Sequence, residues 1–371
     1  MLRSKLPCHM HPSITGQELA FLCSGHAWKD ASRRVVMIDT HFAWVFLGAR
    51  EVYKLKKPLR HGRMDYRTLA QRRRGCLAEL SLNRRTAPGI YLGVVPLTRT
   101  AIGMMRLGGR GRAIDYLVRM RRLPARWMLD AVLMRRPARP RELAALLAML
   151  GSFFARARRR PRAAAGHIEH LRRTLASTSS KLRTDAPALR SRIDEVDALQ
   201  RRCLRQLRPE LALRAGLLVD GHGDLRPEHL CLQPMAVIDC IEFDAGLRRM
   251  DPAEEVAFLA LEMARLGRAC SASALLHHYC TTLDSHASSA LLHFYMSLRA
   301  AARAKVSAWH IGDPQFPDPR PWLARTRSYL EDAAWHARIV LRQQPTDWSA
   351  GGGPAFRQWR QRPAGRDALH R

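Results

Sequence analysis

The sequence predicts an α+β fold with two lobes: a small β-rich lobe containing one helix, followed by a larger helical lobe. Three observations lead to this prediction. Residues 35–58 are rich in β-branched and aromatic residues, which is typical of strands. Beyond Pro124, apolar residues recur at helical spacing in several long segments. Within that helical region, residues 217–244 return to short apolar runs that resemble strands.

The first lobe is expected to span residues 34–120, after an N-terminal extension, residues 1–33, with at most one short helix. The stretch VVMIDTHFAWVFLGAREVYKLKKP breaks at Gly48 and predicts two or more strands. TLAQRRRGCLAELSLNRR, residues 68–85, has the apolar spacing of a helix. Residues 90–120 predict further strands. GGRGRA at 108–113 follows no suitable strand and precedes no helix, so we interpret it as a turn.

The second lobe is expected to span residues 121–345 and to consist mainly of helices. DPAEEVAFLALEMARLG at 251–267 opens with Asp-Pro, a common start for a helix. The other segments with helical spacing are residues 125–134, 141–159, 191–207, 277–286, 291–310 and 321–343. The tail, residues 346–371, is rich in Gly, Pro and Arg and is predicted to be disordered.

The chain is strongly basic, with a net charge of +31 in 371 residues. Such a charge attracts phosphates, nucleic acids and anionic surfaces. The basic residues are nearly all arginine and are scattered along the chain, and no nucleic-acid recognition motif accompanies them. Nucleic acid is therefore a possible partner that no motif supports. The P-loop motif is also absent from the sequence.

Cysteine usage and hydropathy favour a cytoplasmic protein without a membrane partner. The eight cysteines form no Cys-x-x-Cys pair, and the first residues lack the apolar segment of a signal peptide. The longest apolar run, residues 143–155, is too short to span a bilayer. Because RARRRPR follows it, a membrane-surface helix is an alternative, but a core helix with a solvated basic end is the favoured interpretation. The oligomeric state is not predicted.

Acids and histidines gather in GHGDLRPEHLCLQPMAVIDCIEFD, residues 221–244. LCL and MAVID are short apolar runs separated by Gln233 and Pro234, which predicts an antiparallel hairpin. Asp224 precedes the first run and Asp239 ends the second, so the hairpin brings the two carboxylates toward each other. Two close carboxylates repel unless a cation lies beside them. Mg²⁺, which prefers oxygen ligands, is the natural candidate.

EVYKLKKP holds three of the seven lysines of this arginine-rich chain. Strand alternation places Lys54 and Lys56 on one face. A strand lysine can act as a point charge on phosphate, although an exposed edge strand protected by lysines is an equal alternative. Glu79 follows on the predicted helix, where it can pair with the strand lysine.

Together these segments resemble the aminoglycoside-phosphotransferase branch of the protein-kinase-like fold. The closest likeness is to an uncharacterised bacterial group with the HGDLRPEH and IDCIEFD motifs. THFAWVFLGAREVYKLKKP, LAELSLNRR, APGIYLGVVPL and DPAEEVAFLALEM also match, and the likeness covers roughly residues 34–340. The resemblance implies a bilobal kinase-like fold and an enzyme that moves the γ-phosphate of ATP or GTP to a hydroxyl of a small molecule. It also implies Mg²⁺, with Mn²⁺ as an alternative, as the cofactor.

The resemblance also implies roles for the acidic cluster. Asp224 matches the catalytic-loop aspartate that orients the acceptor hydroxyl and accepts its proton. His222 matches the loop histidine that supports the geometry of the loop. Asp239 matches the aspartate that holds the metal bridging the nucleotide phosphates.

In the first lobe, Lys56 or else Lys54 matches the strand lysine that contacts the α- and β-phosphates. Lys56 is preferred, because LKKP resembles the end of the family's strand. Glu79 matches the helix glutamate that pairs with this lysine. Asp251 matches the Asp-Pro that buttresses the site, and its expected role is structural.

Two departures from the family pattern lead to an alternative hypothesis about the function. His229 stands where the loop usually has asparagine, although an amide oxygen suits Mg²⁺ better than imidazole does. The second metal position is therefore missing, altered, or rebuilt from Glu228 or Glu242. The Gly-rich phosphate loop is also absent, since THFAWVFLG contains only Gly48. These departures support a second hypothesis, a weakly active or inactive kinase-like nucleotide-binding module.

A metallohydrolase built from the same acids and histidines ranks last, because Lys56 and Glu79 would then have no role. The acceptor is not named by the sequence. Cationic aminoglycosides usually meet an acidic pocket, so a charge of +31 favours an anionic or neutral metabolite.

Overall fold

The computed structural model of the chain describes residues 16–25, 27, 28, 35–284, 286–313 and 316–342. The chain divides into two compact units. The sheet unit comprises residues up to Ala125 together with Gln233–Gly246, and the helical unit comprises Arg126–Leu232 and the chain from Leu247 onward. The predicted disordered tail, residues 346–371, and most of the predicted extension, residues 1–33, lie outside the described residues.

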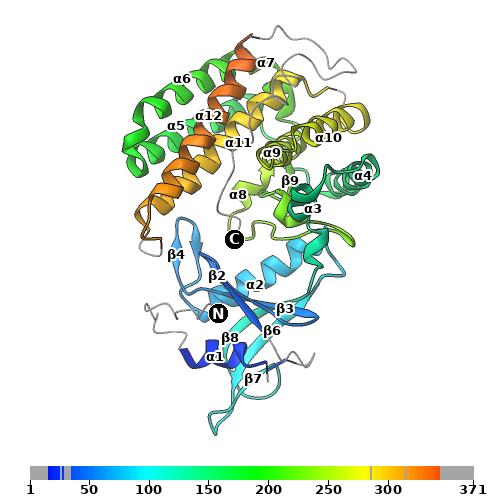
Figure 1. Ribbon diagram of the computed structural model, residues 1–371, viewed down its shortest axis with the longest axis vertical. Helices are drawn as coiled ribbons and strands as arrows, with labels where there is room; N and C mark the ends of the chain where they lie inside the picture. The colour runs from blue at the N-terminus through cyan, green and yellow to red at the C-terminus, as the bar shows by residue number, and fades with distance from the viewer. Residues whose placement is uncertain (1–15, 26, 29–34, 285, 314–315, 343–371) are drawn as a thin grey trace. The chain divides into compact units, whose positions relative to one another are not determined.

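The sheet unit is built on six antiparallel strands in the order β1-β2-β3-β8-β6-β7. These strands and the helix α2 are drawn in blue and cyan in Figure 1. The bounds are α1 Gly16–Cys23, β1 Val36–Asp39, β2 Ala43–Leu47, β3 Glu51–Lys56, β4 Arg60–His61, β5 Met64–Asp65, α2 Leu69–Asn83, β6 Tyr91–Arg99, β7 Met105–Leu107, β8 Arg112–Arg121 and β11 Met235–Val237.

Each face of this sheet is covered by one helix. On one face Leu22 of α1 packs in a core with Phe46, Leu55 and Leu117. On the other face Cys76 of α2 belongs to a second core cluster, which also includes Val52, Tyr91 and Val118. The helix within residues 16–23 is therefore part of the core of the sheet unit.

Strand alternation in β3 decides where its lysines point. Tyr53 and Leu55 belong to the core beneath α1, so Lys54 and Lys56 face α2 instead. Lys54 lies opposite Val118 of β8, and β3 is the third strand from the sheet edge, inside β1 and β2. The alternative of an exposed edge strand is wrong, because β3 is paired on both sides.

A capping box sets the start of α2. Thr68 accepts a hydrogen bond from the Gln71 amide, and the Gln71 side chain accepts one from the Thr68 amide, which forms a capping box.

The glycines at 108–111 lie between β7 and β8, so the interpretation of GGRGRA as a turn is confirmed. Gly111 has φ +139°, and a methyl group there would lie 2.8 Å from the carbonyl oxygen of Arg99.

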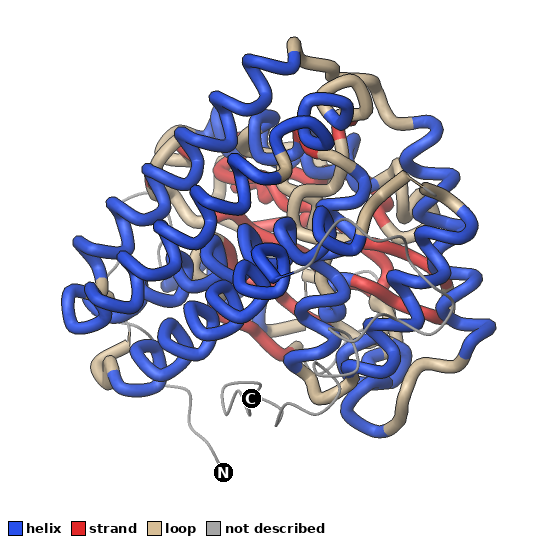
Figure 2. The backbone as a smooth tube through the Cα atoms, turned by 90° about the horizontal axis from the view of Figure 1, so that it is seen from above, coloured by secondary structure: helices blue, strands red, loops and turns tan. Residues whose placement is uncertain are grey.

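The helical unit contains most of the helix of the chain, shown in blue in Figure 2. Its helices α11 and α12 pack along each other (Figure 1). The bounds are α3 Leu129–Arg135, α4 Pro140–Arg156, α5 Ala164–Asp185, α6 Arg190–Gln206, α7 Arg208–Arg214, β9 Val219–Asp220, β10 Leu230–Leu232, α8 Ala245–Arg248, β12 Arg249–Met250, α9 Pro252–Arg265, α10 Ala269–Thr282, α11 Ser289–Trp309 and α12 Arg320–Arg342, where Ala245 and Gly246 of α8 fall in the sheet unit.

The predicted α+β fold class, a β-rich lobe followed by a helical lobe, is confirmed. Asp251 caps α9 by accepting a hydrogen bond from the Ala253 amide at 2.9 Å, as its Asp-Pro start predicts. The 22-residue helix α5 was not among the predicted helices. No helix in the described part of the chain combines the length and apolarity that a bilayer crossing requires.

Candidate active site

Two lysines of β3 share one carboxylate of α2. Lys54 Nζ lies 3.0 Å from Glu79 Oε1, and Lys56 Nζ lies 2.7 Å from Glu79 Oε2. The side chains of Glu79 and Lys56 are 0% and 2% exposed, whereas that of Lys54 is 17% exposed. Burial alone would lower the pKa of each lysine, but the neighbouring carboxylates raise both pKa values well above the ordinary value. Both lysines therefore stay charged, and the predicted contact between Lys56 and Glu79 is present.

Lys56 is enclosed by a second set of partners. Its Nζ donates a hydrogen bond to Glu242 Oε1, and the hydroxyl of Tyr66 donates to the same oxygen at 2.6 Å. Lys56 Nζ also lies 4.8 Å from the centre of the Tyr66 ring. Gly75 of α2 leaves room for this arrangement, since a methyl group there would lie 2.6 Å from Tyr66 Cε1 and 3.1 Å from Lys56 Cε.

The end of α2 holds the backbone on both sides of Asp239. Asn83 Oδ1 accepts a hydrogen bond from the Cys240 amide at 2.9 Å. Asn83 Nδ2 donates to the Glu79 carbonyl at 2.8 Å, which ties this contact to the helix that carries the shared carboxylate. Just beyond the helix, Thr86 Oγ1 donates to the Val237 carbonyl at 2.8 Å. The strand lysines, the α2 glutamate and the 237–242 segment therefore form one connected structure.

Asp239 is the only non-glycine residue with positive φ in the described part of the chain, at 64°. Aspartate is among the few non-glycine residues that visit this left-handed region. Its amide donates to the Tyr91 hydroxyl at 3.1 Å, and its Oδ1 lies 2.5 Å from Lys54 Nζ. The side chain is 44% exposed, so the carboxylate is accessible to a ligand while Lys54 fixes its orientation.

The donor set of the sheet unit fits a hard divalent cation at Asp239 better than at Glu242. Mg²⁺ binds through one or two carboxylates together with substrate phosphates and water, and the accessible carboxylate of Asp239 meets this requirement. Glu242 is 9% exposed, and its Oε1 accepts hydrogen bonds from Lys56 and Tyr66. Burial alone would raise the pKa of Glu242, but Lys56 and Lys54 lower it, so Glu242 is an ionised partner of the lysines.

In the helical unit, Asp224 is paired with Arg226, two residues further along the loop. Arg226 Nε and Nη2 each lie 2.9 Å from a different oxygen of Asp224. A further nitrogen of Arg226 donates to Glu228. Burial alone would raise the pKa of Asp224, but the charges of Arg226, His229 and Arg303 hold it below the ordinary value. Asp224 is therefore ionised throughout the neutral range.

The two loop histidines both contact the backbone of this loop. His222 is buried, and its Nδ1 accepts a hydrogen bond from the Asp224 amide at 3.3 Å. His229 Nδ1 lies 2.8 Å from the Asp224 carbonyl oxygen, and its Nε2 lies 3.2 Å from Arg226 Nη2. Since both ring nitrogens of His229 face loop groups and one faces a guanidinium, this arrangement favours a structural role over metal binding.

The loop is also held from α9 and α11. Glu255 Oε1 accepts hydrogen bonds from the amides of His222 at 2.7 Å and Gly223 at 2.5 Å. Burial raises the pKa of Glu255 to about 7. Arg299 donates to the Gly223 carbonyl at 3.3 Å and pairs with Glu254 at 2.8 Å. The backbone preceding Asp224 is therefore fixed by one acceptor and one donor from neighbouring helices.

The sequence-predicted residues fall into two groups. Lys54, Lys56, Glu79, Asp239 and Glu242 lie together in the sheet unit. The loop residues lie in the helical unit: His222, Asp224 and His229. The approach of Asp224 to Asp239 stays a prediction.

Among the residues that contact the predicted ones, sequence reasoning missed Tyr66, Arg226 and Glu255. Arg226 lies within the quoted HGDLRPEH motif, so its proximity to Asp224 was a usable signal. Glu255 lies within DPAEE, which was noted only as a helix start. Tyr66 gave no signal, because its contact with Glu242 joins residues 176 positions apart.

Strand lysines paired with a helix glutamate, and an aspartate in a His-Gly-Asp loop, are features that match the pattern of kinase-like phosphotransferases. The sequence profile described as the phosphotransferase enzyme family (APH) matches residues 97–292, more than half of the 371 residues. The chain belongs to this family.

The chain is also similar to curated proteins of unassigned function. Uncharacterised proteins of Mycobacterium tuberculosis (strain H37Rv) and Mycobacterium bovis are each 31% identical over 282 residues, covering 72% of this chain and 53% of the relative. The chain thus spans about half the length of the curated relatives it matches.

The solved structures that are distantly similar include two that cover most of this chain. The GDP and kanamycin complex of APH(2")-IIia has a TM-score of 0.49 and 11% identity, covering 85% of this chain and 98% of the other. A choline/ethanolamine kinase family protein from Mesorhizobium loti has a TM-score of 0.47 and 12% identity, covering 87% of this chain and 99% of the other.

Proposed function

We propose that this protein transfers the γ-phosphate of ATP or GTP to a hydroxyl group of a small molecule, with Mg²⁺ or Mn²⁺ as cofactor. The observation that carries the proposal is the position of Lys54, whose ammonium group lies between Glu79 and Asp239. A lysine fixed by a helix carboxylate next to a metal-binding aspartate is the phosphate-binding arrangement of kinase-like enzymes.

Exposure supports Lys54 over Lys56 as the lysine that contacts the nucleotide phosphates. Lys54 is 17% exposed and Lys56 is 2% exposed. The ammonium of Lys56 is already surrounded by Glu79, Glu242 and the Tyr66 ring. We therefore propose that Lys54 binds phosphate and that Lys56 holds Glu79 and Glu242 in place, which reverses the preference drawn from LKKP.

Asp224 is proposed to orient the acceptor and to receive its proton. The hydroxyl oxygen of the acceptor forms a bond to the γ-phosphorus as the bond to the β-phosphate oxygen breaks. The hydroxyl proton passes to Asp224, and the nucleoside diphosphate leaves. Because Arg226 lowers the pKa of Asp224, this carboxylate is a weak base that orients the hydroxyl and takes its proton late in the transfer.

Asp239 is proposed as the metal ligand, and a metal bound there would neutralise charge on the nucleotide phosphates. His229 and Glu242, expected as further ligands, have less support because their polar atoms already contact the loop and Lys56 respectively. The cytoplasmic location and any binding of nucleic acid stay predictions.

The engaged ring of His229 also favours the second hypothesis, a kinase-like module that binds nucleotide with little turnover. Purified protein is incubated with γ-labelled ATP or GTP and Mg²⁺ or Mn²⁺, and transfer or slow hydrolysis is measured beside nucleotide affinity. Binding of the nucleotide without any transfer or release of the labelled γ-phosphate would support the binding module over the enzyme.

Three variants test the residue assignments. Asp224→Asn should abolish turnover while nucleotide affinity persists, and Asp239→Ala should abolish metal-dependent nucleotide binding. Asp318→Asn, which changes an exposed acid of the helical unit, serves as the matched control. If the first two variants behave like the wild type, the assignment is wrong.

A further inference from the structure

Arg303 lies on the face of α11 that supports the Asp224 loop. Arg299, one helical turn earlier, donates to the Gly223 carbonyl at 3.3 Å. Residues four apart share a helix face, so Arg303 faces the same neighbourhood. Its charge is also one of those that hold the pKa of Asp224 below the ordinary value.

Unlike its neighbours, Arg303 is only loosely paired. Its Nε donates to the Tyr329 hydroxyl at 3.4 Å and lies 3.7 Å from Glu262 Oε1. Within the described part of the chain, its two terminal nitrogens make no hydrogen bond. The side chain is nevertheless only 13% exposed. A guanidinium has five N–H donors, and among the described residues only the Nε donor of Arg303 has a hydrogen-bond partner. The terminal donors can therefore bind a further acceptor.

The acids beside this arginine have other partners. Glu262 accepts hydrogen bonds from the Tyr329 hydroxyl at 3.0 Å. Asp224 and Glu228 are paired with Arg226. A cationic acceptor would therefore compete with existing hydrogen-bond donors for each of these carboxylates, whereas an anionic acceptor would meet an available guanidinium.

We propose that Arg303 binds an oxyanion, a carboxylate or phosphate group carried by the acceptor, and that the acceptor is an anionic hydroxyl compound. This inference rests on the proposed phosphotransferase function. Arg303 belongs to the same unit as Asp224, the residue proposed to hold the acceptor hydroxyl, and the phosphate-binding lysine belongs to the other unit. The oxyanion is therefore assigned to the acceptor rather than to the transferred phosphoryl group.

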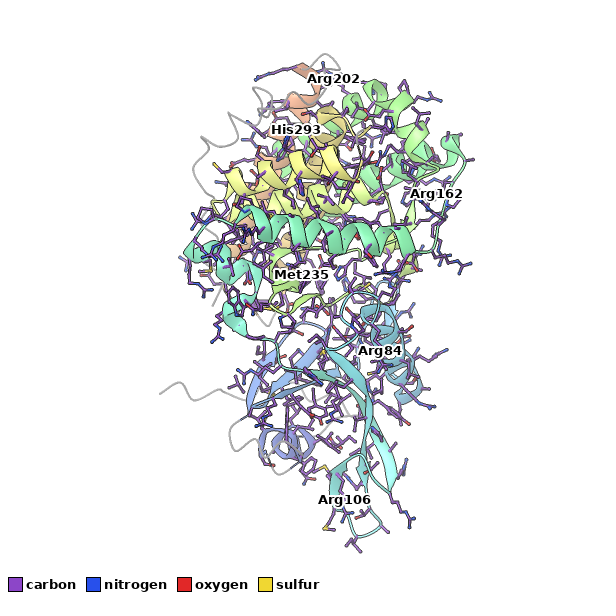
Figure 3. The ribbon with its side chains drawn as sticks, turned by 90° about the vertical axis from the view of Figure 1, so that its right-hand side faces the viewer. Arg84, Arg106, Arg162, Arg202, Met235 and His293 are labelled. Atoms are coloured by element: carbon purple, nitrogen blue, oxygen red, sulfur yellow. The ribbon has the colours of Figure 1, made fainter. Side chains whose placement is uncertain are left out.

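The first test is a calorimetric titration with inorganic phosphate at constant ionic strength. Arg303→Met should weaken phosphate binding about tenfold or more, the effect of losing a charge-assisted contact. Arg303→Lys should weaken it less, because the charge remains. The matched control is Arg202→Met, an exposed arginine of α6 labelled in Figure 3, which should leave binding unchanged. Circular dichroism checks the fold of each variant. If Arg303→Met does not fold, the phosphate affinity of Arg303→Lys decides the test.

Repeating the titration with a non-hydrolysable ATP analogue distinguishes the two sources of the oxyanion. Phosphate should still bind beside the analogue if the position belongs to the acceptor. Competition between the two would assign the position to the transferred phosphoryl group and overturn the proposal. Equal affinity in wild type and Arg303→Met, or no phosphate binding by the wild type, would also overturn it.

The second test compares acceptors that differ in charge. Release of nucleoside diphosphate is measured with glycerol, glycerate, glycerol 3-phosphate and choline. Any acceptance should favour the anionic members at least tenfold, and Arg303→Met should remove that preference. Preference for glycerol or choline would contradict the inference while leaving the phosphotransferase proposal intact. A protein that neither binds nor hydrolyses nucleotide would instead refute the proposed function.

Discussion

Replacing the two β3 lysines one at a time should separate folding from nucleotide binding. Lys56→Met removes the cation that lies against Glu79 and Glu242, both nearly inaccessible to solvent. Breaking a buried ion pair from one side costs about 3–5 kcal/mol. At about 4 °C per kcal/mol for a unit of this size, the sheet unit should melt about 12–20 °C lower.

Lys54→Met should have the opposite balance of effects. Glu79 keeps Lys56, and the carboxylate of Asp239 is 44% exposed and can be hydrated, so the stability loss should be about 1 kcal/mol. The lost contact with phosphate should weaken nucleotide binding by about 10- to 100-fold.

The assay combines thermal unfolding followed by circular dichroism with fluorescence titration of a labelled ATP analogue in Mg²⁺. The conservative variants Lys54→Arg and Lys56→Arg serve as controls, since they retain the charge. A stable Lys56→Met protein that no longer binds nucleotide, beside a Lys54→Met protein that binds it normally, would refute the division of roles.

Three further changes test the framework around these residues. Arg226→Met removes the cation that holds the pKa of Asp224 low, so the acidic limb of the pH–rate profile should move up by about 1 unit or more; an unmoved limb would exclude Asp224 as the titrating group. Because burial raises the pKa of Glu255 to about 7 from 4.5, the folded chain holds this proton to a higher pH than the unfolded chain. Stability should therefore fall as pH rises from about 4.5 to about 7, by on the order of 2–3 kcal/mol; denaturant titrations should show this slope in wild type and not in Glu255→Gln. Gly75→Ala places a methyl group 2.6 Å from Tyr66 Cε1, and this clash outweighs the helix-propensity gain of about 1 kcal/mol; an unchanged or higher melting temperature would show that the Tyr66 ring is free to move.

Short-range patterns were enough to predict the strand-helix-strand order of the sheet unit, whereas the pairing of Lys56 with Glu79 also rested on the resemblance to the family. Alternation fixes which strand residues face the helix, and helix spacing fixes which helix residues face back. The same reasoning could not rank Lys54 against Lys56, because both lie on one face of β3. Their difference in exposure comes from Tyr66 and Glu242, whose positions depend on packing between distant segments.

Two other features could not be predicted from the sequence, one because of its composition and one because it depends on contacts between segments far apart in the chain. Helix α5 contains the stretch TLASTSS, and serine and threonine weaken helix propensity and obscure the apolar spacing. The segment 233–246 packs with the sheet unit, although its neighbours in the chain belong to the helical unit. That placement depends on two hydrogen bonds to backbone about 150 residues later in the chain. Asn83 accepts one from the Cys240 amide, and Thr86 donates one to the Val237 carbonyl.

The left-handed backbone conformation of Asp239 affects which residues this position can accept. Glycine adopts φ 64° without the steric cost that a side chain brings there, so Asp239→Gly should relax the backbone by about 1 kcal/mol. The same change would delete the carboxylate that faces Lys54. Because the change would also remove the ion pair with Lys54, which contributes up to about 1 kcal/mol, the two effects on fold stability nearly cancel. In homologues of this chain, glycine at this position would mark proteins that keep this backbone turn without the carboxylate proposed to bind metal.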